Sequence, residues 1–504
     1  MTEIRYDLLI IGGGINGTAI ALDAAGRGLK VMLCEANDLA SGTSSASTKL
    51  IHGGLRYLEQ GHFCFVRESL REREILMKKA PHMVHPLNFI MPHSRSLRPA
   101  FFIRIGLFLY DHLGGRKLLS HSKRVSLREQ PAGQILQESF TIGFRYADCW
   151  TNDARLVVLN AIAAKELGAS IQTRTKVTAA TRNVDHWTVT LTNQRNGTAS
   201  QINAQIIVNA AGPWADHVLH DELHLSDTQH TFLVKGSHII VKRIGTQTEA
   251  LLLQHTDKRI IFVIPYLEQY SLIGTTDLNY ESDPADVKIS AEEIRYLCDA
   301  VNGYLKTPLQ PTDVLHSYSG VRSLVYDGNK NASTATRDFH LQLDDIDGQC
   351  PILSVFGGKL TTHRQLAEEA LTRLKSYFAT LQPAWTAQSI LPGGDLPTAD
   401  FINFVADCQQ QYHQFDAALI KRYANLYGTR IHTLLENMHN TSELGKHYGY
   451  SLYAKEVHYL IEKEFAETAE DILWRRTNLG YFFPESGLAE LEIDLKNITA
   501  KSII

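Results

Sequence analysis

The sequence predicts a mixed α/β (α+β) protein in which a Rossmann-like, doubly wound domain is interleaved with an antiparallel sheet and followed by an α-helical domain. Three observations predict this fold class. A strand, glycine, helix and strand pattern opens the chain, and helical patterns dominate from Ala399 onward. Between them, short β-branched and aromatic runs predict four strands of an antiparallel sheet, at Thr231–Lys242, Ala250–Gln254, Arg259–Tyr266 and Tyr270–Gly274.

Composition narrows the possible classes of protein. The 504 residues are enough for two or three domains, and a net charge of -4 excludes a globally basic nucleic-acid-binding protein. Six cysteines without CxxC or Cys/His spacing indicate reduced thiols and no metal site. We find no signal-peptide pattern and no apolar run of the roughly 18 to 20 residues that cross a bilayer. We therefore expect an intracellular protein that does not span a membrane.

The N-terminal segment has the pattern of a dinucleotide-binding unit. Tyr6–Ile11 is a near-continuous apolar run, as in a buried parallel strand, and Thr18–Gly26 has helical periodicity. Between them Gly12, Gly14 and Gly17 have GxGxxG spacing. These glycines allow a tight turn, close backbone approach to a pyrophosphate and close helix–strand packing. The spacing alone would also fit an ordinary glycine-rich turn.

Later segments strengthen this prediction. A second strand, Lys30–Cys34, ends at Glu35, about 20 residues beyond the glycines, where a carboxylate can accept from ribose hydroxyls. Gln205–Trp214 and Pro351–Thr362 are further strands that run into glycine-bearing turns, and Thr361 or Thr362 is a candidate helix N-cap. NAD enzymes usually need only the first motif. Three glycine-marked strand ends suit a longer cofactor.

Several motifs together resemble those of one enzyme family. GGGING, TSSASTKLIHGGLRYLE, NAAGPW, KGSHIIV, IGTTD, YSGVR and FGGKLTT occur in the order typical of aerobic FAD-dependent glycerol-3-phosphate dehydrogenases, members of the D-amino-acid oxidase-like flavoprotein group. The resemblance runs from about residue 5 to the C-terminal region. It implies FAD-dependent oxidation of sn-glycerol 3-phosphate to dihydroxyacetone phosphate, with hydride transfer to flavin and electrons passed to a membrane quinone. We expect FAD to be held without a covalent link.

The predicted domains follow these motifs. The FAD-binding domain takes about residues 1–80, 145–228 and 318–385, the substrate and membrane-side domain about 81–144 and 229–317, and the helical domain 386–504, after a linker signal at Leu391–Gly394. The residues predicted to bind the cofactor are Gly12, Gly14, Ile15, Asn16, Gly17, Glu35, Thr43, Ser44, Ser45, Ser47, Lys49, Leu50, His52, Val177, Ala211, Gly212, Trp214, Gly358, Lys359, Leu360 and Thr361.

Oxidation of a phosphorylated secondary alcohol needs an anchor for the phosphate and stabilisation of the reduced flavin. Arg56 and Arg322 are candidate anchors, because guanidinium groups match phosphate oxygens bidentately, and Thr275 and Tyr57 can add hydroxyl donors. By resemblance Lys359 lies near both flavin and substrate, where a cation favours an anionic reduced ring. The arginines could instead be solvated surface charges, and Lys359 could bind only the pyrophosphate.

The reaction also needs a base for the hydroxyl proton. His52 lies four residues before Arg56 and has a side chain suited to proton transfer near neutral pH, and His238 is its rival. The predicted catalytic residues are therefore His52, Arg322 and Lys359. His52, His238, Arg56, Tyr57, Thr275, Arg322 and Lys359 are the predicted substrate-binding residues.

The segment from His82 to Arg128 combines many basic residues with an aromatic run, Phe101–Tyr110, and contains Asp111 but no further acid. Its basic residues are Arg95, Arg98, Arg104, Arg116, Lys117, Lys123, Arg124 and Arg128. Such a segment suits an anionic membrane surface, with Phe101, Phe102 and Leu107 as inserting residues. The alternative is a buried helix flanked by solvated charges. Because the quinone acceptor lies in the bilayer, we expect peripheral attachment to the cytoplasmic face of the inner membrane, with part of the protein in the cytoplasm.

Two other functions remain open from sequence. One is an oxygen-using glycerophosphate, amine or hydroxy-acid oxidase, and the other is an FAD-bearing protein with a non-catalytic membrane or assembly role. The expected partners are glycerol 3-phosphate, a quinone and an anionic membrane surface, with no nucleic acid. The sequence does not fix the oligomeric state, for which a homodimer is one candidate.

Overall fold

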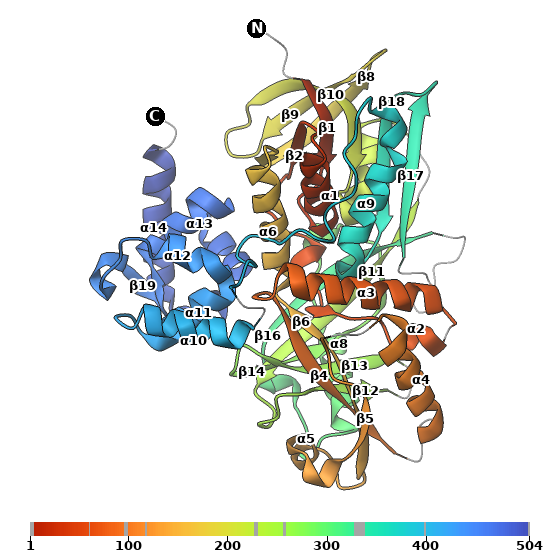
Figure 1. Ribbon diagram of the computed structural model, residues 1–504, viewed down its shortest axis with the longest axis vertical. Coiled ribbons are helices and arrows are strands. Elements are labelled where there is room, and N and C mark those ends of the chain that lie inside the picture. The colour runs from red at the N-terminus through yellow and green to blue at the C-terminus, as the bar shows by residue number, and fades with distance from the viewer. Residues whose placement is uncertain are drawn as a thin grey trace.

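The computed structural model describes residues 5–59, 61–94, 99–115, 118–225, 230–255, 259–326, 338–397 and 400–501. Two β-sheets form the upper and lower parts of the main body in Figure 1, and a helical domain lies beside them. Four of the predicted basic residues, Arg95, Arg98, Arg116 and Lys117, lie outside the described residues.

The first sheet has a parallel centre, as a doubly wound domain requires. β1 pairs in parallel with β2 and β10, and β10 pairs in parallel with β18. In spatial order the strands are β17 (Phe339–Ile346), β18 (Gln349–Gly357), β10 (Ala199–Asn209), β1 (Arg5–Ile11), β2 (Val31–Cys34) and β7 (Ser170–Gln172), and the hairpin of β8 (Thr175–Arg182) and β9 (Trp187–Asn193) joins at β10. The predicted fold class is confirmed in this domain.

Both faces of the first sheet are covered, which explains its continuous apolar strands. On one face Leu8 and Ile10 pack under α1 (Ile15–Gly26), α6 (Asp153–Glu166) and α9 (His363–Arg373). On the other face Leu9 and Ile11 pack in a cluster with residues of the β8–β9 hairpin. Successive residues of a strand point to opposite faces, so a strand that is covered on both faces has apolar residues at consecutive positions.

Glycine is required at two positions in the first turn. A Cβ at Gly12, which has φ +110°, would lie 2.6 Å from the carbonyl oxygen of Ala210. A Cβ at Gly17 would lie 2.0 Å from the carbonyl oxygen of Gly12. These contacts bring the carboxyl ends of β1 and β10 together and seat the start of α1 directly against the turn.

The second sheet is mostly antiparallel. The four runs predicted as strands form β11 (Thr231–Lys242), β12 (Ala250–Gln254), β13 (Ile260–Tyr266) and β14 (Tyr270–Gly274), each within one residue of prediction. Its other strands are β3 (Leu50–Ile51), β4 (Val84–His93), β5 (Lys123–Ser126), β6 (Ile142–Thr151), β15 (Leu278–Tyr280) and β16 (Val314–Val325). β3, much of β6 and much of β16 come from ranges predicted to belong to the FAD-binding domain.

Helices cover both faces of the second sheet as well. α5 (Pro131–Ile135) and α8 (Ala291–Asn302) pack on one face, and α3 (Phe63–Lys79) and α4 (Ala100–Leu113), which follow the short α2 (Arg56–Glu59), pack on the other. In α4, Leu107 is 2% exposed and belongs to the core, whereas Phe101 and Phe102 are 68% and 65% exposed. The prediction that Leu107 inserts into a membrane was therefore wrong, because it faces the sheet.

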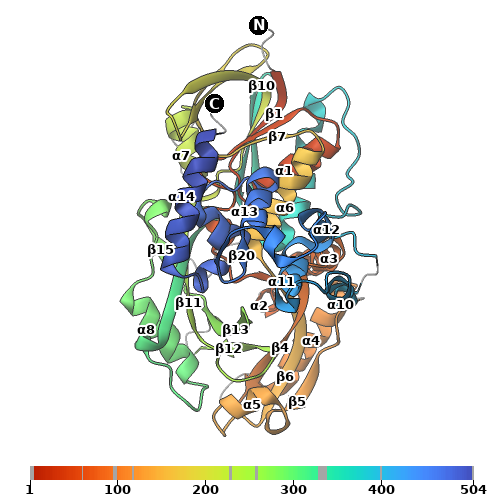
Figure 2. The same ribbon diagram turned by 90° about the vertical axis from the view of Figure 1, so that its left-hand side faces the viewer.

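The C-terminal domain is helical, as predicted, and has its own hydrophobic core. It contains α10 (Phe401–Gln411), α11 (Ala417–Tyr427), α12 (Ile431–Leu434), α13 (Ala454–Glu464), α14 (Glu485–Lys501) and a small hairpin of β19 (His447–Gly449) and β20 (Leu452–Tyr453). Figure 2 shows this domain in front of α6. Among the described residues, no helix has both the length and the apolar character needed to cross a bilayer.

Candidate functional site

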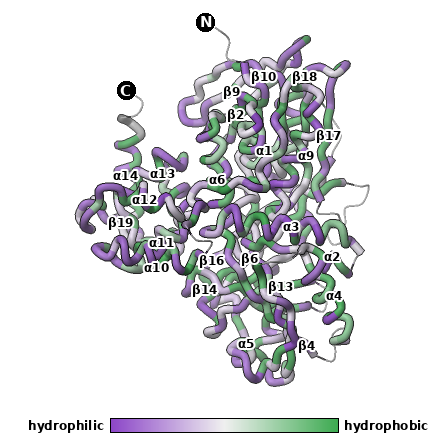
Figure 3. Tube along the Cα trace, in the orientation of Figure 1, coloured by the Kyte–Doolittle hydropathy of each residue, from purple (hydrophilic) through white to green (hydrophobic). Residues whose placement is uncertain are grey.

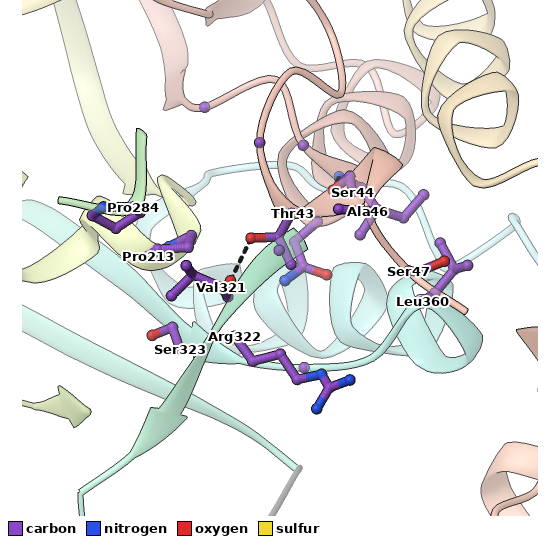
Figure 4. Close-up of a pocket in the computed structure, with 18 of the residues that line it drawn as sticks. Thr43, Ser44, Ala46, Ser47, Pro213, Pro284, Val321, Arg322, Ser323 and Leu360 are labelled. Carbon is purple, nitrogen blue, oxygen red and sulfur yellow. Dashed lines mark hydrogen bonds between the residues drawn. The ribbon is translucent and has the colours of Figure 1, made fainter. Parts of the chain in front are cut away.

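A cavity of about 1040 Å³ extends from the carboxyl ends of β1, β2 and β10 to the second sheet. Figure 4 shows part of its wall, with Thr43 and Ser44 on one side and Val321, Arg322 and Ser323 of β16 on the other. The hydroxyl of Thr43 donates to the carbonyl of Val321 at 2.5 Å. The carboxyl edge of an open α/β sheet is the usual ligand position, and here the second sheet closes over it.

The N-terminal turn forms one part of the cavity as a cradle for an anionic group. The start of α1 supplies backbone N–H groups and the positive end of the helix dipole. The N–H of Ile15 donates to the Ser44 hydroxyl at 2.9 Å, so the serine-rich segment lies directly on this helix terminus. Gly14, whose missing side chain leaves the backbone open, lies beside the same hydroxyl.

Glu35 is fixed at the end of β2. Its two carboxylate oxygens accept from the N–H groups of Gly13 at 2.6 Å and Asn37 at 2.8 Å. Burial raises the pKa of Glu35, and the two backbone donors oppose that shift. The carboxylate thus stands beside the glycine turn, where ribose hydroxyls of a dinucleotide would meet it.

The two later glycine segments reach the same cavity. After β10, residues 210–214 form a turn that continues into α7 (Ala215–His217), and Gly212 has φ +57°. After β18, the carbonyl of Gly357 accepts from the side chain of Asn16 in α1 at 3.3 Å. Thr362 is the N-cap residue of α9, as predicted, although its side chain makes no capping hydrogen bond. The neighbouring Thr361 hydroxyl accepts from the backbone N–H of His52 at 3.2 Å.

The loop that carries His52 is held from α4. The N–H of Gly53 donates to the hydroxyl of Tyr110 at 2.8 Å, and that hydroxyl donates to the carboxylate of Asp148 on β6 at 2.7 Å. Arg73 of α3 donates to Asp148 at 2.5 Å. This buried chain of hydrogen bonds fixes the loop between His52 and Arg56 from beneath.

Three basic side chains from different segments line this end of the cavity: Arg56, Arg322 and Lys359. The Lys359 ammonium lies over the rings of Tyr57 and Phe65, at 4.1 and 3.4 Å from their centroids. Arg322 forms an ion pair with Asp277. The cavity therefore carries several cationic side chains, and the carboxylate of Asp277 orients one guanidinium group.

Gly236 of β11 leaves space for the side chains of Arg322 and Thr275. A Cβ at Gly236 would lie 2.8 Å from the hydroxyl of Thr275 and 2.9 Å from a guanidinium nitrogen of Arg322. The missing side chain therefore leaves room for both groups to approach the strand. A hydroxyl donor and a guanidinium group side by side suit an anion such as phosphate.

His238 lies behind the cavity wall. It is 1% exposed, its Nε2 is 2.9 Å from the hydroxyl of Thr48, and its ring stacks on Tyr318 with centroids 4.8 Å apart. Burial lowers the pKa of His238 far below its usual range, and the nearby charges of Arg322 and Lys49 lower it further. His238 is therefore neutral near pH 7 and supports the wall.

Most predicted site residues line the cavity. Those that do are Gly12, Gly14, Ile15, Asn16, Glu35, Thr43, Ser44, Ser47, Leu50, His52, Arg56, Tyr57, Val177, Ala211, Gly212, Trp214, Thr275, Arg322, Gly358, Lys359, Leu360 and Thr361.

Four predicted residues, Gly17, Ser45, Lys49 and His238, are not part of the wall. Gly17 packs against the turn, and the Lys49 ammonium donates to Asp153 at 2.6 Å and to the Ser45 carbonyl at 3.0 Å. That ion pair is buried, which explains why Lys49 faces α6 and not the ligand space.

Sequence reasoning missed two groups of wall residues. Asp277 lies within the motif IGTTD, which offered a signal, whereas Tyr146 and Asp148 on β6 had none. No residue of the C-terminal domain is among the predicted site residues, yet Thr468, Glu470 and Arg475 line the cavity at the end that contains Glu35. Their contribution depends on a contact between distant segments, which no local pattern reveals.

Comparison with known families agrees with this geometry. Residues 7–364 match the family described as FAD dependent oxidoreductase, and residues 384–495 match the C-terminal domain of alpha-glycerophosphate oxidase. Residues 365–383 separate the two matched regions, and the linker predicted at Leu391–Gly394 lies just inside the second region.

Individual relatives are similar over nearly their whole length. A glycerol-3-phosphate dehydrogenase of Pseudomonas aeruginosa is 49% identical over 95% of this chain and 93% of its own. A D-erythritol 1-phosphate dehydrogenase of Brucella abortus is 48% identical over 94% of each chain. The solved structure of a glycerol-3-phosphate dehydrogenase from Bacillus halodurans, complexed with FAD, is 27% identical, with a TM-score of 0.76 over 99% of this chain and 95% of that one.

The support of the His52 loop gives a first testable prediction. Tyr110→Phe removes the hydroxyl that connects Gly53 to Asp148 and leaves a buried N–H without its acceptor, at a cost of about 1 to 3 kcal/mol. We expect slower reduction of the bound cofactor by substrate, with cofactor content unchanged. The matched control is Tyr304→Phe. The Tyr304 hydroxyl donates to the carbonyl of Gln254 at 2.6 Å, and neither residue lines the cavity. Equal reduction rates in the two folded variants would mean that Tyr110 does not position the loop.

Proposed function

Because this chain belongs to the FAD-dependent oxidoreductase family and groups within it with the glycerol-3-phosphate dehydrogenases, we propose that it oxidises sn-glycerol 3-phosphate to dihydroxyacetone phosphate and passes the electrons through FAD to a membrane quinone. The observation that carries the substrate assignment is that Arg56, Arg322 and Lys359 all line the cofactor cavity, with Lys359 over the ring of Tyr57 and Arg322 beside Thr275 at Gly236. Each of these side chains can contact a phosphate oxygen of a small phosphorylated alcohol.

The residues present fit FAD. The cradle at Gly12 and Gly14 and the N-terminus of α1 would hold the pyrophosphate, and Glu35 would accept from the ribose hydroxyls. When bound, the flavin supplies the hydride acceptor. We assign substrate binding and removal of the hydroxyl proton to side chains of the protein.

We assign substrate binding to the cationic end of the cavity. Arg322, oriented by Asp277, and Arg56 would hold the phosphate, with Thr275 and Tyr57 as hydroxyl donors. To Lys359, whose ammonium lies over Tyr57 and Phe65, we assign the stabilisation of negative charge on the reduced cofactor. His52 would take the proton of the secondary hydroxyl, since its loop is fixed through Gly53 and Thr361 and it lines the cavity.

The Brucella abortus relative points to a second candidate substrate, D-erythritol 1-phosphate. Glycerol 3-phosphate and D-erythritol 1-phosphate both combine a phosphate with secondary alcohol chemistry, and the second has one more hydroxylated carbon. The relatives named for these two substrates are 49% and 48% identical to this chain. The ratio of kcat/KM for the two substrates decides between them.

The electron acceptor is a separate proposal. An exposed apolar face of α4, formed by Phe101, Phe102, Ile105 and Phe108, supports attachment to a bilayer that holds quinone. Figure 3 shows α4 as a largely hydrophobic helix at the side of the molecule. The exposed basic residues Arg104, Lys123, Arg124 and Arg128 belong to the same segment and suit anionic lipid headgroups. Rapid formation of hydrogen peroxide by the purified protein would instead support an oxygen-using oxidase.

The phosphate anchor can be tested by an exchange of cations. Arg322→Lys keeps the charge but loses the planar fork, so kcat/KM for glycerol 3-phosphate should fall about ten- to over a hundredfold, which corresponds to about 1.5 to 3 kcal/mol. FAD content should remain at the wild-type level. Arg295→Lys, on an exposed ion pair of α8, is the control and should have normal kinetics. Near-normal kinetics in FAD-loaded Arg322→Lys would refute the assignment.

The choice of base can be tested with a pair of histidine variants. His52→Gln should slow reduction of the bound flavin by roughly 10² or more while FAD stays bound, because proton removal is lost. His238→Gln should have a smaller effect, since this buried side chain does not line the cavity. Anaerobic stopped-flow measurements with each variant provide the comparison. If His238→Gln is the slower variant, the roles of the two histidines must be exchanged.

Membrane attachment can be tested on the α4 face. The triple substitution Phe101→Ser, Phe102→Ser and Phe108→Ser changes only exposed side chains and should release the protein from anionic vesicles, while dye-linked activity survives. A matched control replaces Val184, Ile346 and Ile402, which are also exposed but belong to other regions, with serine. Wild-type binding should weaken with added salt without disappearing. A folded α4 variant that still floats with vesicles would place the docking surface elsewhere.

A further inference from the structure

A buried cluster of charges joins the C-terminal domain to the loop that follows β2. At its centre is Asp38, which is 1% exposed. Both terminal nitrogens of Arg476 donate to its carboxylate at 2.8 Å, and Nε of Arg475 donates at 2.6 Å. Two arginines of the C-terminal domain therefore bind one carboxylate of the FAD-binding domain.

Asp471 forms the second centre of this cluster. It accepts from Arg174 at 2.7 and 2.8 Å, from Arg475 at 2.5 Å, and from the backbone N–H groups of Glu467 and Thr468 at 2.9 and 3.0 Å. Burial alone would raise the pKa of Asp471, but the arginines outweigh it and lower the pKa below its usual range. Asp471 is thus charged near neutral pH, and the members of the cluster hold one another in fixed positions.

The same loop carries the carboxylate assigned to the ribose. Asp38 is three residues beyond Glu35, and the Asn37 N–H between them donates to Glu35 at 2.8 Å. Backbone N–H groups of Arg174 and Thr175 donate to the carbonyls of Asn37 and Glu35, both at 2.8 Å. A shift of Asp38 would therefore move Glu35.

Residues of the C-terminal domain also reach the cofactor space directly. Thr468, Glu470 and Arg475 line the cavity together with Asn37 and Thr175. Arg475 uses its three nitrogens on Asp38, Glu470 and Asp471, at 2.5 to 2.7 Å, so its guanidinium is locked. The Glu470 side chain is 70% exposed and presents a carboxylate that can accept from an amino or hydroxyl group.

We propose that the C-terminal helical domain is part of the cofactor site: residues 468–476 close the adenosine end of the cavity and, through Asp38, position Glu35. The inference rests on FAD as the cofactor. A cluster that served only to join two domains would have no reason to line the cavity. Buried ion pairs also contribute little net stability compared with apolar packing, so a positional role accounts better for this cluster.

The test measures affinity for FAD in the full-length apoprotein. Arg475→Gln and Asp38→Asn each break the cluster, and we expect the FAD dissociation constant, followed by quenching of flavin fluorescence, to rise roughly ten- to a hundredfold. Glu470→Gln changes an exposed side chain and leaves the contacts of Arg475 with Asp38 and Asp471 in place, so it keeps the test decisive. It should weaken binding severalfold. Arg430→Gln, which breaks a different contact of the C-terminal domain, with Glu166 of α6, is the control and should bind FAD normally.

Competition with ADP locates the effect. ADP shares the adenosine and pyrophosphate of FAD and lacks the flavin, so the Arg475→Gln and Glu470→Gln variants should lose ADP and FAD affinity by the same factor. FAD affinity within twofold of the wild type in all three folded variants would overturn the proposal. So would weakened FAD binding with unchanged ADP binding, because the effect would then lie at the flavin end. A wild-type apoprotein that binds no FAD would contradict the proposed function itself.

Discussion

The close approach of β1, β10 and α1 at Gly12 is the constraint on which the rest of the structure depends. A side chain at Gly12 would collide with the Ala210 carbonyl, and one at Gly17 would collide with the carbonyl of Gly12. The strand ends and the start of α1 can meet at one point because neither glycine has a side chain. Ser44, Glu35 and the turn after β10 are arranged around that point, and the cavity begins there.

The second sheet turns this nucleotide cradle into a reaction site. β3 leads into the His52 loop, β16 carries Arg322, and β11 leaves space at Gly236 for Arg322 and Thr275. We assign the part of the cavity near Glu35 and Asp38 to the nucleoside of the cofactor, and the part lined by Arg56, Arg322 and Lys359 to the anionic substrate. The two ends differ in chemistry because different domains supply their walls.

The sequence predicted those features that depend on local patterns. Strands β11 to β14 were placed within one residue because β-branched runs and turns mark them, and GxGxxG spacing marked the cofactor cradle. Leu107 was misassigned because the buried face of a helix depends on its neighbours, not on its own composition. Tyr110, Asp148 and Arg475 carried no signal, since each acts through contacts far away in sequence: the bond between Arg475 and Asp38 joins residues 437 positions apart.

Anaerobic titration of the FAD-loaded protein with glycerol 3-phosphate tests the central claim most directly. If the cationic end of the cavity binds a phosphorylated alcohol beside the flavin, glycerol 3-phosphate should bleach the flavin absorbance without any external acceptor. Unphosphorylated glycerol should bleach it far more slowly at the same concentration, because the contacts of Arg56 and Arg322 are then unused. Equal bleaching by both compounds, or none by any phosphorylated alcohol while FAD remains bound, would contradict the account.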